Sequence, residues 1–236
     1  MIGEGINRNK LKYIAVFFMI VDHIGYFFIP ITSTIGFACR LFGRITAPIM
    51  CYFLAEGYIY TSDKKKYGLR LLVFSLISQI AFYFATFKVG KEFQLNMIFN
   101  LFFSFLVLLS YDKIKNRFLK WLCILLLICA CNFCDWGITP PLYILLFYIF
   151  RNDKKKQILS FCIISVFMIV KNMIWCMLNN QVWFIRLFDY GVFLAIPILC
   201  QYNREKGSNS KFNKWFFYIL YPLQFFVFGI IKRIFF

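Results

Sequence analysis

The sequence predicts an all-α, polytopic membrane protein, a helical bundle with about eight to nine transmembrane helices. Its 236 residues are 61% hydrophobic and include 33 phenylalanines, which is more apolar surface than a soluble domain of this size can bury. The apolar residues form continuous runs, whereas a transmembrane β-barrel would alternate apolar and polar residues. We therefore expect membrane-spanning helices that form one domain over residues 1–236.

The candidate spans follow from mean hydropathy in a window of about 19 residues. Several of the apolar runs are short, which leaves the count at eight or nine. The runs lie near residues 11–30, 45–61, 69–87, 96–110, 118–133, 138–150, 157–175, 187–201 and 215–231.

The net charge of +17 would suggest a nucleic-acid partner in a soluble protein. Here the basic residues lie in short clusters between apolar runs, which is typical of loops that face the cytoplasm. Most of the 27 lysine and arginine residues fall on one side if the N-terminus is cytoplasmic. The sequence thus predicts a multi-pass protein of the bacterial cytoplasmic membrane that contacts the lipid bilayer and no nucleic acid.

The stretch from Lys10 to Pro30 carries Asp22 and His23 in the middle of an apolar run of spanning length. His23 is the one histidine of the chain. A titratable side chain inside a span is unfavourable, so the pair is by default a functional-site hypothesis. The imidazole is suited to act as a general base near neutral pH. The alternative is a buried histidine that hydrogen-bonds a backbone carbonyl or a tyrosine.

Glu56 is the first candidate to orient His23. At a helix rise of about 1.5 Å per residue, His23 lies roughly 16 Å from Lys12, and Glu56 lies roughly 18 Å from Arg44 at the opposite surface. These estimates give the two side chains a similar depth. Asp22 and His23 point about 100° apart on a helix, so they do not face each other.

Arg40 and Arg44 lie at an expected outer helix start, and Pro48 in the following run loosens helical hydrogen bonding and leaves room for a cavity. These arginines bind an anionic group, pair with Asp22 or Asp135, or extend to the membrane surface. Asp135 itself lies at an outer turn. The residues alone leave these alternatives open.

Asn96 and Asn100 lie one turn apart in the fourth predicted span, where polar side chains need partners inside the bundle. They serve either as substrate contacts or as contacts between helices. Cys131 and Cys134 form a CxxC pair, for which we expect structural packing and leave a redox role open. Because no histidine remains to complete a ligand set, no metal site is predicted.

Two basic clusters between predicted spans are candidates to hold the phosphates of a nucleotide-like cofactor. The alternative is that they fix the topology or touch anionic lipid. Lys64, Lys65, Lys66 and Arg70 form the first cluster, and Arg204 with Lys206 forms the second.

Several stretches, in order along most of the chain, resemble the TraX family of bacterial membrane proteins. The combination of DHIG, GRxxxP and FYxxYPL is more specific than any one stretch. The stretches are 15–25 (AVFFMIVDHIG), 43–48 (GRITAP), 54–58 (LAEGY), 67–71 (YGLRL), 135–137 (DWG) and 217–223 (FYILYPL).

This resemblance implies an acetyltransferase that uses acetyl-CoA, since the founding member of the family is associated with N-terminal acetylation of conjugative pilin. More distantly, the chain is similar to multi-span acyltransferases that acetylate cell-surface glycans. The resemblance implies that His23 is catalytic, with Asp22, Arg44 and Glu56 as further site residues. We also assign Arg40, Asn96, Asn100, Asp135 and Tyr221 to substrate binding as candidates. Where family members commonly have histidine after YPL, this chain has Gln224.

The function that we predict is transfer of an acetyl group from acetyl-CoA to an acceptor at or across the membrane. The acceptor is a peptide N-terminus, a glycan or a small molecule. Two other classes stay open: a transporter in which Asp22, His23 and Glu56 relay protons, and a non-catalytic assembly or immunity factor.

Overall fold

The computed structural model describes residues 5–86, 94–205, 207–208 and 210–235. Within these residues the chain is helical and contains two isolated β-bridges but no β-strand. Lys206, which the sequence assigns to a basic cluster, lies outside the described residues. The elements are α1 (Arg8–Phe28), α2 (Thr34–Gly43), α3 (Thr46–Tyr60), α4 (Lys64–Thr86), α5 (Met97–Lys113), α6 (Arg117–Ala130), η1 (Cys131–Phe133), α7 (Thr139–Ile149), α8 (Lys154–Leu178), η2 (Trp183–Leu194), α9 (Ala195–Cys200) and α10 (Lys211–Phe235).

The helical membrane class is confirmed, but the number of long spans differs from the prediction. In the described chain, 6 helical segments are long and apolar enough to cross a membrane, rather than eight or nine. The difference arises because α5, α6 and α7 have 17, 14 and 11 residues, fewer than the roughly 20 that a full span needs. The segments are Arg8–Phe28, Thr34–Tyr60, Lys64–Thr86, Lys154–Leu178, Trp183–Cys200 and Trp215–Phe235.

The chain folds into two compact units, each with most of its contacts inside the unit. Unit 1 comprises Met1–Met50 and Cys162–Ile219, and unit 2 comprises Cys51–Phe161 and Leu220–Phe236. The predicted single domain over residues 1–236 stays a prediction, because compact units can belong to one domain.

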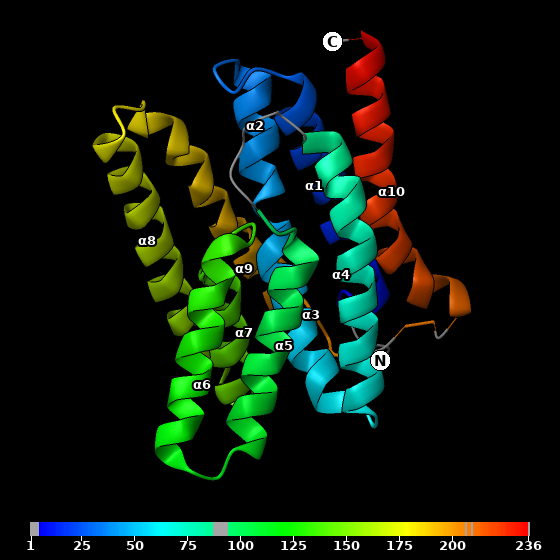
Figure 1. Cartoon of the computed structure of the whole chain (residues 1–236), viewed down its shortest axis with the longest axis vertical. Helices are drawn as coiled ribbons and strands as arrows, with labels where there is room; N and C mark the ends of the chain where they lie inside the picture. Colours follow the sequence, from blue (N-terminus) through cyan, green and yellow to red (C-terminus); the bar gives the residue numbers. More distant parts are fainter. Residues whose placement is uncertain (1–4, 87–93, 206, 209, 236) are drawn as a thin grey trace. The chain divides into compact units, whose positions relative to one another are not determined.

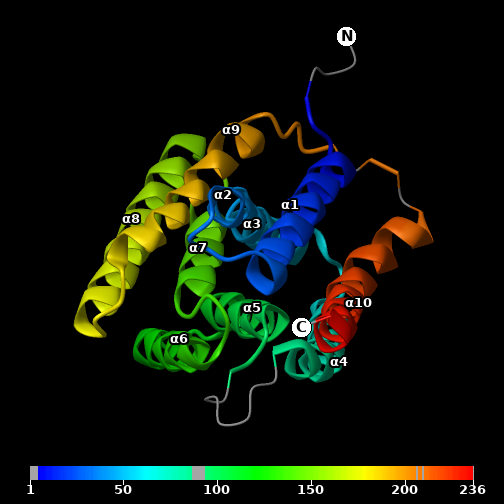
Figure 2. The ribbon, with the colours of Figure 1, turned by 90° about the horizontal axis from the view of Figure 1, so that it is seen from above.

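Unit 1 is built around a helical hairpin of α1 and α2, which lie side by side in Figures 1 and 2. The hairpin begins where Asn7 accepts the backbone N–H of Lys10 at 3.0 Å. It turns where Ser33 accepts the backbone N–H of Gly36 at 3.0 Å, so each helix starts at a polar cap. The Thr46 hydroxyl donates to the Ala15 carbonyl at 2.9 Å. η2 also packs against α2 of this hairpin.

Unit 2 packs α5 against α4, α6 and α7. The part of α10 that belongs to this unit lies along α4, as Figures 1 and 2 show, with Phe226 stacked on Phe84 at 4.9 Å between ring centroids. The Arg233 guanidinium lies over the same Phe84 ring at 3.7 Å. Tyr58, Tyr143 and other fully buried side chains form the interior, so this unit has its own apolar core.

Candidate functional site

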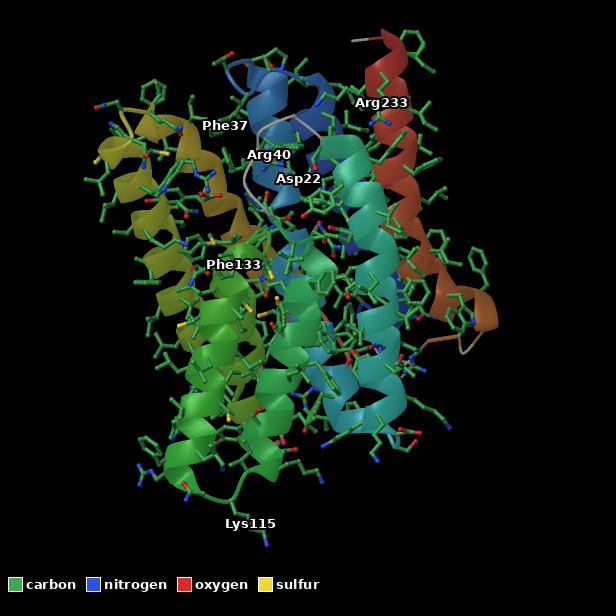
Figure 3. The ribbon with its side chains drawn as sticks, in the orientation of Figure 1. Asp22, Phe37, Arg40, Lys115, Phe133 and Arg233 are labelled. Carbon is green, nitrogen blue, oxygen red and sulfur yellow. The ribbon has the colours of Figure 1, made fainter. Side chains whose placement is uncertain are left out.

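The sequence-predicted site residues Asp22 and Arg40 form an ion pair inside unit 1. Arg40 Nη1 lies 2.8 Å from Asp22 Oδ1, and the two side chains are only 14% and 13% exposed. Asp22 is in the second-last turn of α1 and Arg40 in the second turn of α2, so both lie at the same distance from the connecting turn. Figure 3 labels the two residues on their neighbouring helices.

Gly43 provides the room for this pair. A Cβ atom at position 43 would overlap the side chain of Asp22. The glycine of the GRxxxP stretch therefore lets α1 and α2 approach closely, as small residues do between membrane helices. This contact ties the motif to the site geometry.

Arg40 lies inside α2, whereas Arg44 caps the end of α2 two residues before α3 begins, so the expected position at a helix start holds for Arg44 and not for Arg40. The helical segment begins at Thr34, and the apolar stretch Thr34–Tyr60 contains both arginines in its interior. The prediction missed α2 because it took the two arginines as the end of a span. Their ion pairs with Asp22 and Asp189 instead compensate the charges within the segment.

Asp189 is the main site residue that the sequence reasoning missed. Its side chain is 2% exposed and forms ion pairs with Arg44 Nε at 3.0 Å and Arg186 Nη2 at 2.9 Å. The Asn172 amide also donates to it at 3.0 Å. Arg44 thus pairs with Asp189, an aspartate that the sequence analysis did not name. A signal was available, because Asp189 is the one carboxylate in the predicted span 187–201.

The Phe188 ring lies among three arginines. The guanidinium carbons of Arg40, Arg44 and Arg186 lie 5.3, 4.6 and 5.0 Å from its centroid. An aromatic face attracts cations, more strongly where water is excluded. Phe188 is itself buried, so it helps to fix the three guanidinium groups within unit 1.

His23 follows Asp22 on α1 and is half-buried. Its ring centroid lies 6.5 Å from that of Phe27, one turn further along the helix. Since consecutive helical side chains point about 100° apart, His23 lies beside the Asp22–Arg40 pair rather than between its partners. Glu56 is buried in α3 and belongs to unit 2, so its pairing with His23 stays a prediction.

Asn96 and Asn100 bind backbone within unit 2. Asn96 caps α5 by accepting the backbone N–H of Ile98 at 2.8 Å, and it donates to the Ser75 carbonyl at 2.9 Å. Asn100 donates to the Asp135 and Gly137 carbonyls, each at 2.8 Å. These bonds favour the alternative in which the two asparagines join helices and turns.

Asp135 and Tyr221 also contact backbone near α5. The Asp135 carboxylate accepts the backbone N–H of Trp136 at 3.0 Å, and the buried Tyr221 hydroxyl accepts that of Met97 at 3.3 Å. Tyr221 therefore lies at the start of α5. Their assignment to substrate binding stays a prediction.

The basic cluster at the start of α4 is partly neutralised. Lys64 Nζ lies 3.1 Å from Asp112, which also accepts the hydroxyls of Tyr58 at 2.9 Å and Tyr148 at 2.6 Å. Asp112 was not among the residues predicted from the sequence. Lys66 pairs with Asp63 at 3.4 Å, and the backbone N–H of Lys66 lowers the pKa of the Asp63 carboxyl.

Several members of the predicted cofactor clusters are exposed, including Lys66, whose side chain is 81% exposed. Lys65 and Arg204 are exposed, and Arg70 lies over the Tyr67 ring at 5.7 Å. Arg204 belongs to unit 1 and the α4 cluster to unit 2, so a shared cofactor site stays a prediction. In the described residues, no three His, Cys, Asp or Glu side chains form a group suited to a metal ion.

Comparison with known proteins decides the family. The model of the TraX protein family matches residues 7–232, nearly the whole chain. The chain belongs to the TraX family. The resemblance predicted from the sequence stretches is therefore confirmed.

Two relatives of this TraX-family chain differ in how much of it they cover. A probable fimbrial assembly protein of Dichelobacter nodosus (FimC, serogroup H1) is 28% identical over 226 residues, 91% of both chains. An uncharacterized protein of Rickettsia prowazekii (strain Madrid E) is 24% identical over 166 residues, 68% of this chain and 62% of that protein. No solved structure matches this chain.

The TraX-like site residues are distributed over both compact units. Asp22, His23 and Arg44 belong to unit 1, whereas Glu56 and Tyr221 belong to unit 2. Gln224, at the position where the family commonly has histidine, is buried in α10.

Proposed function

We propose that this TraX-family protein is a membrane-embedded acetyltransferase. It transfers an acetyl group from acetyl-CoA, which enters from the cytoplasmic side, to an acceptor at or across the membrane. The observation that supports this most is the position of the sole histidine, in a spanning helix and next in sequence to Asp22 of the Asp22–Arg40 ion pair. A titratable residue retained at such a position calls for a role.

In the proposed reaction His23 acts as general base. It removes a proton from the attacking amine or hydroxyl of the acceptor while that atom bonds to the thioester carbonyl carbon. Arg44 stabilises the negative charge that develops on the carbonyl oxygen. The carbon–sulfur bond then breaks, and the coenzyme A thiolate takes up the proton from His23. No covalent acetyl-enzyme is required.

The surrounding residues have positioning roles in this proposal. Asp189 holds Arg44 through the 3.0 Å ion pair, and Asp22 holds Arg40 against α1, the helix that carries His23. Glu56 orients the imidazole if the predicted pairing forms. Lys65, Lys66 and Arg204 are exposed cations of the two predicted cofactor clusters, and in this proposal one of these clusters binds the phosphates of acetyl-CoA.

The relative from Dichelobacter nodosus bears on the acceptor. It is named as a probable fimbrial assembly protein and covers 91% of this chain. This favours a role beside a pilus, with a pilin N-terminus as acceptor. The same name also supports a second candidate, a non-catalytic assembly factor of the bacterial cytoplasmic membrane.

One experiment separates the two candidates. The detergent-purified protein is incubated with acetyl-CoA labelled in the acetyl group, and free thiol and labelled products are measured with and without peptide amines. An acetyltransferase releases coenzyme A well above background, His23→Ala lowers this release by about 10²–10⁴-fold, and Lys156→Gln leaves it unchanged. A non-catalytic factor gives background release for all three proteins.

A further inference from the structure

Two cations near Asp189, Lys171 and Arg186, are accessible and have no role in the proposed reaction. Lys171 lies on α8 and Arg186 on η2, two consecutive elements joined by residues 179–182. The Lys171 side chain is exposed, and that of Arg186 is 30% exposed. Asp189, 2% exposed, lies behind them.

Asp189 holds this arrangement in place. It pairs with Arg186 at 2.9 Å and accepts a hydrogen bond from Asn172, the residue after Lys171, at 3.0 Å. A Cβ at Gly191 would overlap the Leu41 carbonyl, so η2 lies directly on α2 and has little freedom to shift. An arginine that simply extended toward the membrane surface would not need a buried carboxylate to fix it.

Three positive side chains, those of Arg44, Arg186 and Lys171, lie near the one carboxylate of Asp189. Lys171 lies within electrostatic reach of both Arg186 and Asp189. The same carboxylate already pairs with Arg44 at 3.0 Å. Like charges repel more strongly near a low-dielectric interior, and an anion that contacts both Lys171 and Arg186 would relieve this repulsion.

The neighbouring side chains indicate where such an anion lies. Trp175 and Trp183 are exposed, 55% and 43%, at the end of α8 and the start of η2. Tryptophan is enriched where a membrane protein passes from hydrocarbon to headgroups. Lys171 is one turn from Trp175, and Arg186 one turn from Trp183, so both cations lie just inside this boundary.

We propose that Arg186 and Lys171, positioned by Asp189, bind a phosphate-type oxyanion between α8 and η2. The planar guanidinium donates two parallel hydrogen bonds to such a group, and the ammonium adds a compact charge. The phosphate belongs to the headgroup of an anionic phospholipid or to a soluble ligand. This site is separate from the acetyl transfer at His23, so it stands whether or not that activity is found.

The test uses the full-length protein in a non-ionic detergent after removal of bound lipid. Inorganic phosphate is titrated at constant ionic strength while thermal unfolding is followed by tryptophan fluorescence. We expect a saturable rise in Tm, because a ligand that binds the folded state stabilises it. Arg186→Gln should weaken the apparent phosphate affinity by about 10-fold or more, since a charge-assisted bidentate contact is lost. Lys156→Gln, at the start of α8, is the matched control and should respond as the wild type does.

Two further arms complete the test. Arg186→Lys keeps the charge but loses the planar pair, so it should fold and show an intermediate affinity. Tm is also compared in nanodiscs of phosphatidylglycerol and of phosphatidylcholine. A higher Tm in phosphatidylglycerol that is lost in Lys171→Gln would assign the phosphate to a lipid headgroup. Equal Tm values in the two lipids would assign it to a soluble ligand. A wild-type Tm independent of phosphate would overturn the site, as would equal responses of the wild type, Arg186→Gln and Lys171→Gln.

Discussion

At the residue scale, the Asp22–Arg40 pair shows how a charge is accommodated inside an apolar helix hairpin. Each partner lies in the second turn from the same connection, and Gly43 leaves room for the carboxylate. The 2.8 Å contact compensates both charges where water is scarce. The sequence analysis offered this pairing as one alternative, because two opposite charges at matched depth can meet, but it could not choose among the available carboxylates.

Breaking this pair should destabilise the protein strongly. Arg40→Gln leaves the Asp22 carboxylate uncompensated, which costs about 3 kcal/mol or more for a buried pair. Asp22→Asn with Arg40→Gln should cost less than the sum of the two single changes. Thermal unfolding in detergent measures both.

The exposed Lys156–Asp153 pair is the control for that experiment. Its side chains are 65% and 42% exposed and screened by water, so Lys156→Gln should leave Tm almost unchanged. Equal losses of Tm for Arg40→Gln and Lys156→Gln would show that the Asp22–Arg40 pair is not buried in the way described.

Lys65 and Arg204, one exposed cation from each predicted cofactor cluster, allow a kinetic prediction. Lys65→Gln and Arg204→Gln should each raise the apparent KM for acetyl-CoA several-fold and change kcat little, because each removes binding that is similar in the ground and transition states. Lys115→Gln, in the loop between α5 and α6, is the control. An unchanged KM in both variants would leave Lys65 and Arg204 with a role in topology alone.

At the scale of elements, the bounds of long apolar helices could be predicted well from hydropathy. They could not be predicted where charged residues interrupt an apolar run. The span expected near 11–30 appears as α1 (Arg8–Phe28), and that near 215–231 as α10 (Lys211–Phe235). The helix expected near 45–61 appears as α3 (Thr46–Tyr60), but α2, which was not expected, extends this apolar segment back to Thr34. A hydropathy window counts Arg40 and Arg44 as unfavourable, whereas Asp22 and Asp189 compensate them from elements distant in sequence.

Asn96 should act as a structural element of unit 2. Asn96→Ala removes the cap of α5 and the bond to the Ser75 carbonyl, so it should destabilise the protein by about 2–3 kcal/mol. Asn116→Ala removes a single exposed cap on α6, where it accepts the Leu119 N–H, and should cost about 1 kcal/mol. Unfolding temperatures compare the two. If Asn96→Ala keeps the wild-type Tm but loses acetyl transfer, the substrate-contact alternative is favoured instead.

At the scale of the whole molecule, the class followed from composition, whereas the number of spans depends on helix lengths. Six segments are long enough to cross, and α7, with 11 residues, covers roughly 16 Å at a rise of about 1.5 Å per residue. A sequence window merges such a helix with its apolar flanks. The assignment of each loop to the cytoplasmic or the outer side of the membrane therefore depends on the basic clusters.

Reporter fusions test this topology. Fusions after Lys66 and after Lys156 should report the cytoplasm, and a fusion at Trp136 should report the outside, because lysine and arginine are retained inside. Alkaline phosphatase and a cytoplasmic fluorescent protein give opposite signals at each site. An external signal after Lys156 would mean that α6 and α7 do not cross as a pair.

The central claim of a catalytic His23 is tested most directly by acetyl transfer per folded molecule in two substitutions. His23→Gln keeps a hydrogen-bonding side chain but cannot accept a proton near neutral pH, so it should be nearly as inactive as His23→Ala, about 10²–10⁴-fold below wild type. The folded fraction is taken from gel filtration in detergent, which separates lost chemistry from lost folding. Near-normal turnover in His23→Gln, together with a poor yield of folded His23→Ala, would contradict the general-base role and leave His23 a structural residue.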